Sequence, residues 1–249
     1  MNGWPYPRLI AHRGGGSLAP ENTLAALKLG ASLGYRASEF DVKLSRDAVP
    51  FLLHDSKLER TTNGAGIAGE FDWSVLAGLD AGAWHSAAYR GEPLPRLDDV
   101  ARFITGNGLM ANVEIKPTPG FEAVTGRAVA RACAELWAGI PVQPLLSSFA
   151  YEALVAARDE APHLPRGWLI ETPTEADFDR LENLGAVSLH CSHRAVTPDL
   201  ISRVQGGGRR VMAWTVNDAE RAECLLGWGV DGIFTDNLRE LAARFGGYL

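Results

Sequence analysis

Short apolar runs alternate with longer amphipathic stretches along most of the chain. The runs suit buried parallel strands and the stretches between them are long enough for helices, which is the pattern of repeated strand–helix units. Closure of eight such units on themselves predicts an α/β fold, the (β/α)8 TIM barrel. The eight candidate strands centre on Leu9–Ala11, Ala37–Val42, Leu109–Ile115, Val142–Leu146, Gly167–Ile170, Val187–His190, Arg210–Trp214 and Gly232–Phe234.

Helix-start signals follow several of these runs. Polar or acidic residues in a first turn satisfy free backbone N–H groups and match the helix dipole. Such signals occur at Pro20-Glu-Asn-Thr23, Asp98-Asp99, Thr174-Glu-Ala-Asp177 and Asn217-Asp-Ala-Glu220.

Residues 55–97 interrupt the alternation. This stretch is rich in Gly, Asp, Thr and Trp and has no clear long helix. A run of that length inside a compact domain is usually a lid or a small subdomain. We therefore predict one catalytic domain over residues 1–249 with an insertion at 55–97 after the second strand region. Trp73, Trp84 and Tyr89 would either wall a pocket or fill a small hydrophobic core there, and we favour the core.

Composition narrows the functional classes. The 249 residues carry 24 Lys and Arg against 30 Asp and Glu, a net charge of −6, which argues against nucleic-acid or anionic-membrane partners. There is no apolar run of about 20 residues for membrane insertion and no leader-like start, so we expect a cytoplasmic protein. Cys133, Cys191 and Cys224 are odd in number and widely spaced, which favours reduced core thiols. The sequence leaves a homo-oligomer open.

Ionisable residues stand at the ends of the early strands. They are His12, Glu39, Asp41, His54, Glu114 and Lys116. Because side chains alternate along a strand, Glu39 and Asp41 share one face, as do Glu114 and Lys116. Catalytic residues of barrel enzymes come from this C-terminal end of the strands. The pattern therefore predicts a site for metal-assisted phosphoryl chemistry.

The residue types suggest individual roles. Three carboxylates without a cysteine suit one divalent cation, Mg²⁺ or Ca²⁺, better than zinc. Arg13 and Lys116 could neutralise a phosphate, and His12 and His54 could exchange protons near neutral pH. Each residue also has a structural alternative: a hydrogen-bonded histidine, solvated acids on an edge strand, or a plain Glu114–Lys116 salt bridge.

An ordered series of motifs resembles the glycerophosphodiester phosphodiesterase family, in particular its short cytoplasmic bacterial members. The resemblance spans nearly the whole chain, and the order of the motifs is more specific than any one of them. The motifs are Trp4-Pro-Tyr-Pro-Arg8, His12-Arg-Gly14, Ala19-Pro-Glu-Asn-Thr23, Glu39-Phe-Asp-Val42, Leu53-His-Asp55, Leu58-Glu-Arg-Thr61, Asn63-Gly64, Pro93-Leu-Pro-Arg-Leu97, Glu114-Ile-Lys-Pro117, Trp214-Thr-Val-Asn217 and Gly229-Val-Asp-Gly-Ile-Phe-Thr-Asp236.

The resemblance implies hydrolysis of a small-molecule glycerophosphodiester, such as glycerophosphocholine or glycerophosphoethanolamine, to sn-glycerol 3-phosphate and an alcohol. It implies that His12 and His54 are the acid/base pair. It also implies a metal site at Glu39, Asp41 and Glu114, phosphate binding by Arg13 and Lys116, and Trp214 beside the glycerol. Departures from the family pattern are Phe40, where many relatives have Leu, and Trp214, where others have Tyr or Phe.

The mechanism implied is a hypothesis at this point. A cation binds a non-bridging phosphate oxygen and the neighbouring glycerol hydroxyl, one histidine deprotonates that hydroxyl, and the other protonates the leaving alcohol. Water then opens the cyclic phosphate. We assign His12 as base and His54 as acid, although the sequence allows the reverse.

Three other classes of protein fit the sequence less well. An amidohydrolase-type enzyme would need a His-x-His pair where this chain has His12-Arg13-Gly14, and a phospholipase would need a membrane-binding helix. A non-catalytic phosphate-binding barrel would not need two histidines and three carboxylates. Some roles stay open: Asn22 and Thr23 either orient the His12 loop or start a helix. His190 and His193, on either side of Cys191, either touch the departing group or are structural, and zinc binding there is disfavoured.

Overall fold

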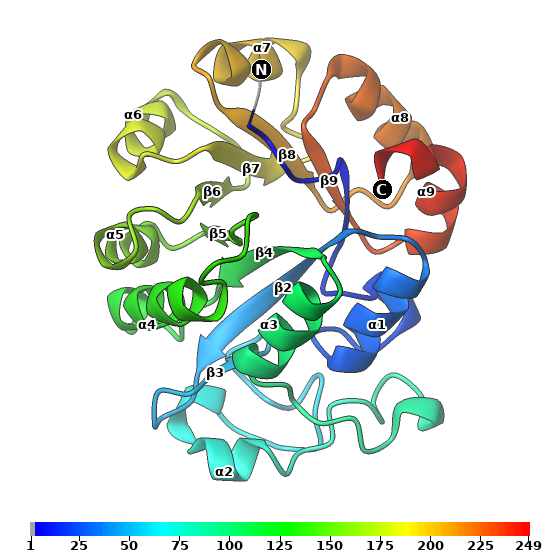
Figure 1. Ribbon diagram of the computed structural model, residues 1–249, viewed down its shortest axis with the longest axis vertical. Coiled ribbons are helices and arrows are strands. Elements are labelled where there is room, and N and C mark those ends of the chain that lie inside the picture. Colours follow the sequence, from blue (N-terminus) through cyan, green and yellow to red (C-terminus); the bar gives the residue numbers. More distant parts are fainter. Residues whose placement is uncertain (1–2) are drawn as a thin grey trace.

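A single sheet closes into a barrel and is surrounded by helices in the computed structural model, which describes residues 3–249 (Figure 1). The strand order is β1-β9-β8-β7-β6-β5-β4-β2-β3, and β1 also pairs with β2, so eight parallel strands form a ring. β3 stands outside that ring. The predicted (β/α)8 barrel is therefore confirmed.

The elements alternate along the chain as the pattern predicts. The strands are β1 Leu9–Ala11, β2 Ala37–Leu44, β3 Pro50–Leu52, β4 Met110–Ile115, β5 Leu145–Ser148, β6 Arg166–Ile170, β7 Ser188–Ser192, β8 Arg210–Trp214 and β9 Gly232–Thr235. The α-helices are α1 Leu24–Ser32, α2 Trp73–Leu76, α3 Leu97–Gly106, α4 Glu122–Leu136, α5 Tyr151–Glu160, α6 Glu175–Leu184, α7 Pro198–Gly206, α8 Ala219–Trp228 and α9 Leu238–Phe245. Short 3-10 turns are η1 Gly16–Leu18, η2 Ala68–Glu70, η3 Ala87–Tyr89 and η4 Gly246–Tyr248.

One strand prediction needs correction, and the strand that leads to His54 lies outside the barrel. The strand expected over Val142–Leu146 begins only at Leu145, because Pro144 has no N–H to donate to a neighbouring strand. The apolar run that leads to His54 is not a barrel strand. It forms β3, which pairs antiparallel with the end of β2 outside the ring.

The predicted helix starts are present. Thr23 caps α1 by accepting a hydrogen bond from Ala26 N, and Asp218 caps α8 by accepting one from Arg221 N. Asp98 and Asp99 lie in the first turn of α3. No helix among residues 3–249 has the length and apolar character needed to cross a membrane.

The barrel strands separate polar from apolar side chains. On β2, Phe40 and Val42 belong to the large core between strands and helices, while Glu39 and Asp41 occupy the alternate positions. A smaller cluster that includes Ile10, Ala37, Met212 and Phe234 fills the barrel interior below. The polar strand ends therefore stand over an apolar layer.

The chain between β3 and α3 extends beyond the ring of helices, as the cyan segment with α2 shows (Figure 1). It buries its own cluster, formed by Phe51, Leu53, Leu58, Ala68, Leu76, Ala81 and Leu94, with Trp73 packed against it. This cluster explains how a segment with so little helix holds a fixed shape.

Gly126→Ala is expected to destabilise the protein. Helices α4 and α5 approach closely at Gly126, where an added Cβ would overlap the carbonyl oxygen of Ala153. Overpacking of this kind costs about 1–3 kcal/mol, which a urea titration would detect as a lower unfolding midpoint. Gly106→Ala is the matched control, since its Cβ meets nothing within 4 Å. An unchanged midpoint for Gly126→Ala would contradict the close packing.

Candidate active site

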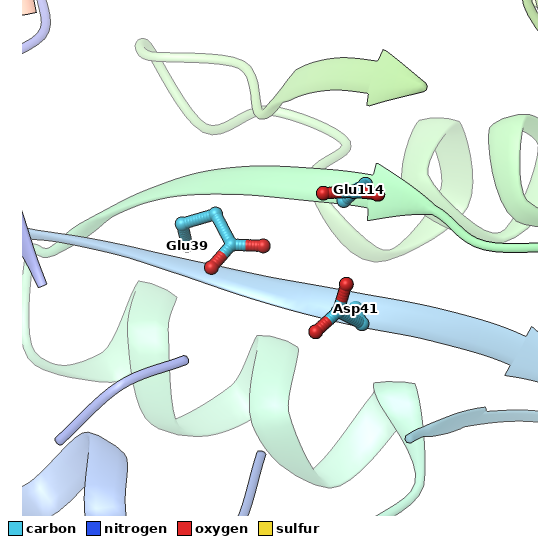
Figure 2. A group of neighbouring side chains, drawn as sticks. All are labelled: Glu39, Asp41 and Glu114. Carbon is cyan, nitrogen blue, oxygen red and sulfur yellow. The ribbon is translucent and has the colours of Figure 1, made fainter. Parts of the chain in front are cut away.

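Three carboxylates converge at the open end of the barrel. Glu39 and Asp41 come from β2 and Glu114 from β4, and each contributes an oxygen so that the three lie within 4.8 Å of one another (Figure 2). The parallel register pairs Asp41 with Glu114, which fixes the two strands side by side. All three residues are buried.

Burial and mutual repulsion set the ionisation of these groups. Burial and the charge of Asp41 raise the pKa of Glu39 to about 8, and the same causes raise the pKa of Glu114. Burial also opposes ionisation of Asp41, but the nearby cations outweigh it and lower that pKa to about 2. Lys116 Nζ lies 2.6 Å from Glu114 Oε1 and 3.6 Å from Asp41 Oδ1. The triad thus holds more acid than its neighbours neutralise.

The three residues fit one divalent cation. Oε1 of Glu39 is buried, yet within residues 3–249 it has no hydrogen-bond partner. Carboxylate oxygens are the ligands preferred by Mg²⁺ and Ca²⁺. A cation there would give the orphaned oxygen a partner and offset the repulsion that raises the pKa of Glu39.

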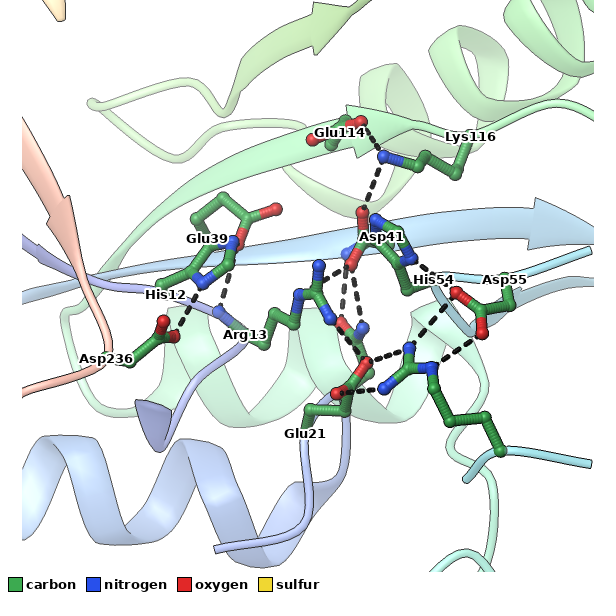
Figure 3. A network of polar contacts seen from close by, with 12 residues as sticks. His12, Arg13, Glu21, Glu39, Asp41, His54, Asp55, Glu114, Lys116 and Asp236 are labelled. Carbon is green, nitrogen blue, oxygen red and sulfur yellow. Dashed lines mark hydrogen bonds and ion pairs between the residues drawn. The ribbon is translucent and has the colours of Figure 1, made fainter. Parts of the chain in front are cut away.

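Two histidines face this triad, each supported by a carboxylate (Figure 3). Nδ1 of His12 lies 2.7 Å from Asp236 Oδ1, and Nδ1 of His54 lies 2.7 Å from Asp55 Oδ1. Since each carboxylate binds Nδ1, Nε2 of both rings stays available for proton transfer. The Nε2 of His12 is 3.8 Å from Glu39 Oε2.

The two histidines differ in pKa. Burial disfavours the His12 imidazolium, but the hydrogen bond to Asp236 and the charges of Glu39 and Asp236 outweigh burial and raise its pKa. Burial lowers the pKa of His54, and the charge of Asp41 offsets only part of that effect.

The loop after β1 is bound to the triad. The backbone N–H of Arg13 donates to Glu39 Oε2 at 2.9 Å. Asn22 Nδ2 donates to Asp41 Oδ2 at 2.8 Å, and Asn22 Oδ1 accepts from the Asp41 N–H at 2.9 Å. Both Arg13 (φ 49°) and Asn22 (φ 58°) adopt left-handed backbone conformations, which are costly for residues other than glycine. Thr23 starts the helix. Asn22 contacts the loop after His12, because its backbone N–H donates to the Arg13 carbonyl at 3.1 Å.

Basic side chains connect the surrounding loops. The Arg60 guanidinium donates to both Asp55 and Glu21, and Arg13 Nη1 donates to Glu21 Oε1 at 2.7 Å. Beneath them, Lys43 Nζ is buried and donates to the backbone carbonyls of His54 (3.4 Å) and Lys116 (3.0 Å). Burial lowers the Lys43 pKa to about 8.

A cavity of about 230 Å³ is lined by every predicted site residue except Asp41, which contacts the lining residues Arg13 and Lys116. The Trp214 ring meets Phe149 edge to face, with ring centroids 5.3 Å apart, and so forms an apolar side of the cavity. The other lining residues are His12, Arg13, Glu39, His54, Asn112, Glu114, Lys116, Ser147, Leu169, His190, Thr215 and Phe234.

Some predictions for other residues are wrong. Trp84 is 41% exposed and lines a second, open hollow beside His12, so it is no part of a hydrophobic core. The Tyr89 ring packs against His85, with ring centroids 5.5 Å apart, and not into the hydrophobic cluster of the insertion. His190 lines the cavity, whereas His193 does not.

The cysteines are free thiols in the described part of the chain. Cys133 and Cys191 are buried, as expected of core thiols, while Cys224 on α8 is only half-buried.

Sequence reasoning missed the residues that support the predicted ones. Asp236 and Asp55 belong to the motifs but had no predicted role, although only one residue separates each from the end of an apolar run. Lys43 gave no signal of its own. Its alternation places it with Glu39 and Asp41, but only the structure shows which carbonyls it reaches.

Comparisons with known proteins agree with this geometry. The family model of the glycerophosphoryl diester phosphodiesterase family matches residues 12–240. The glycerophosphodiester phosphodiesterase of Caldanaerobacter subterraneus is 33% identical and aligns over 92% of this chain and 93% of its own. A phosphodiesterase of Oleispira antarctica, solved with the product sn-glycerol-3-phosphate, superposes with a TM-score of 0.91 at 34% identity, covering 97% of each chain. The enzyme from Agrobacterium tumefaciens superposes at 0.80 with 27% identity, covering 95% of this chain and 99% of its own.

The barrel, with an acidic cluster and paired histidines at its open end, and the relatives it resembles identify a phosphoric diester hydrolase. The chain belongs to the glycerophosphoryl diester phosphodiesterase family and is an enzyme of that family.

Cation binding is expected to release protons and to tighten as pH rises. Glu39 carries a proton below its pKa of about 8, so a cation must displace that proton, and its affinity should increase from pH 6 to pH 8. Calorimetry in buffers of different ionisation enthalpy would count the protons released by Ca²⁺ or Mg²⁺. Glu39→Gln should release fewer protons, and Asp47→Asn, at an exposed acid that accepts hydrogen bonds from Ser45 and Trp73, should release as many as the unsubstituted protein. Binding without proton release in the unsubstituted protein would contradict the raised pKa.

Proposed function

We propose that the protein hydrolyses small glycerophosphodiesters, such as glycerophosphocholine and glycerophosphoethanolamine, to sn-glycerol 3-phosphate and the free alcohol. The observation that carries this proposal is the pair of carboxylate-supported histidines that face one carboxylate triad across one cavity. The product named for the Oleispira antarctica structure is consistent with it.

Two basic side chains would bind the phosphate. Arg13 and Lys116 both line the cavity, and each lies 3.6 Å from an Asp41 oxygen on a different side. Their positive charge offsets an incoming anion in a site of low dielectric constant. Trp214 and Phe149 give the carbon chain of the substrate an apolar wall.

The acids Glu39, Asp41 and Glu114 would hold one divalent cation, Mg²⁺ or Ca²⁺. When bound, such an ion supplies Lewis-acid polarisation of a phosphoryl oxygen.

The histidines supply the proton transfers. We propose His12 as the base for the glycerol hydroxyl beside the phosphate ester and His54 as the acid for the leaving alcohol. The raised His12 pKa of the protein alone favours the opposite order. Positive charge held beside Glu39 lowers the pKa of a neighbouring imidazole, and His12 lies 3.8 Å from Glu39. The proposed order therefore depends on a filled triad.

The space around His54 suits the departing group. A hollow of about 300 Å³ opens beside His54 and is lined by Ser56, Lys116 and Phe149 among others. An alcohol released there lies within reach of the proposed acid. We further propose that residues 1–249 act as one catalytic domain with its insertion at 55–97. We also propose that the reaction takes place in the reducing cytoplasm, because the three cysteines are free thiols.

His12→Ala and His54→Ala are each expected to lower turnover of glycerophosphocholine at least a hundredfold, because one acid/base partner contributes roughly 10²–10⁴ in rate. Glycerol 3-phosphate release, coupled to its dehydrogenase, measures this. His163→Ala is the control, since His163 is exposed in the loop before β6 at the opposite end of the barrel. Near-normal turnover in either active-site variant would remove that histidine from the mechanism.

Chelation is expected to abolish product release, and added Mg²⁺ or Ca²⁺ to restore it. The same assay tests the triad, because its three acids are the residues that would hold the ion. Binding of glycerophosphocholine with no release under any metal condition would instead identify a non-catalytic binding protein.

A further inference from the structure

The deep end of the cavity is lined by polar side chains that have no role in the proposed mechanism. Asn112 on β4 and His190 on β7 are both buried and both line the cavity. Asn112 Nδ2 donates to Ser147 Oγ at 2.8 Å, and His190 Nε2 lies 2.8 Å from Ser188 Oγ. The remaining polar atoms, Asn112 Oδ1 and His190 Nδ1, have no partner in the part of the chain described.

Unpartnered polar atoms in a buried site are costly, so they usually have a ligand or water. The fold makes room for His190 specifically: a Cβ on Gly167 of the next strand would overlap its Nε2. Its ring packs against Phe234 with centroids 5.4 Å apart. Burial lowers the His190 pKa to about 3, so the ring is neutral and offers one donor and one acceptor.

The position of Asn112 along β4 indicates which part of the substrate it would meet. Asn112 precedes Glu114 by two residues on the same face of β4, about 6.6 Å deeper along the strand at roughly 3.3 Å per residue. If Arg13 and Lys116 hold the phosphate at the mouth of the cavity, the three-carbon chain of glycerol would extend into the space between Glu114 and Asn112. Ile10 and Met212 belong to the apolar cluster that fills the barrel interior below.

We propose that His190 Nδ1 and Asn112 Oδ1 bind the terminal hydroxyl of the glycerol moiety, the one farthest from the phosphate. The inference rests on the proposed function and specifies its substrate class. The hydroxyl donates to Asn112 Oδ1 and accepts from Nδ1–H, while His190 Nε2 accepts from Ser188. This closed polar end selects diesters whose terminal hydroxyl is free and rejects those in which it is acylated.

The propane-1,2-diol analogue of glycerophosphocholine tests the proposal, because it lacks only the terminal hydroxyl and keeps the one beside the ester. The unsubstituted enzyme should favour glycerophosphocholine in kcat/KM by about ten- to a hundredfold, since the analogue leaves two buried polar atoms unpaired. His190→Leu should reduce this ratio to near one. His190→Asn keeps a polar atom close to the position of Nδ1 and should retain part of the ratio.

Phe234→Leu is the matched control, since it loosens packing against His190 without removing a polar atom. It should lower kcat/KM for both diesters alike and leave their ratio unchanged. Calorimetric binding of sn-glycerol 3-phosphate and of propane-1,2-diol phosphate should show the same preference without turnover.

The outcomes separate the two proposals. An enzyme that hydrolyses neither diester overturns the proposed function and this inference with it. An enzyme that hydrolyses both equally well, or a folded His190→Leu variant that keeps the full ratio in both assays, overturns the inference alone.

Discussion

Like-charge crowding is the constraint on which the site depends. Three buried carboxylates within 4.8 Å of one another repel, and the cations around them suffice to keep only Asp41 strongly ionised. The strand register brings them together and the barrel core keeps them there, so the repulsion can be relieved only by a proton or a cation. The acidic cluster therefore favours the binding of positive charge at the open end of the barrel.

The surrounding contacts hold the acids and the imidazoles in a fixed relation. Asn22 grips Asp41 through both of its polar atoms, and the backbone of Arg13 grips Glu39. Both residues pay for this with a left-handed backbone, which is the kind of strain that functional loops retain. Lys43 acts from beneath, since its ammonium group connects the carbonyls of His54 and Lys116. Rigid placement of this kind is what proton transfer requires.

Much of this arrangement is readable in the sequence, for reasons that also explain the failures. Buried parallel strands give apolar runs, and polar residues at their ends must lie on the barrel rim, so Glu39, Asp41, Glu114 and both histidines were predictable. The partner of His12 was not, because Asp236 is 224 positions away and only closure of the ring makes it a neighbour. Trp84 was misassigned since composition cannot tell an aromatic wall from an aromatic core. Pro144 prevents β5 from starting earlier, although the apolar residues around it continue the strand pattern.

Closure of the ring between β1 and β9 also has a consequence for biosynthesis. The contact between His12 and Asp236 joins residues 224 positions apart, so the imidazole leaves the ribosome long before its carboxylate partner. A nascent or C-terminally clipped chain can therefore carry the whole acidic cluster and still have an unsupported His12. His12 gains its carboxylate partner only when β9 docks beside β1.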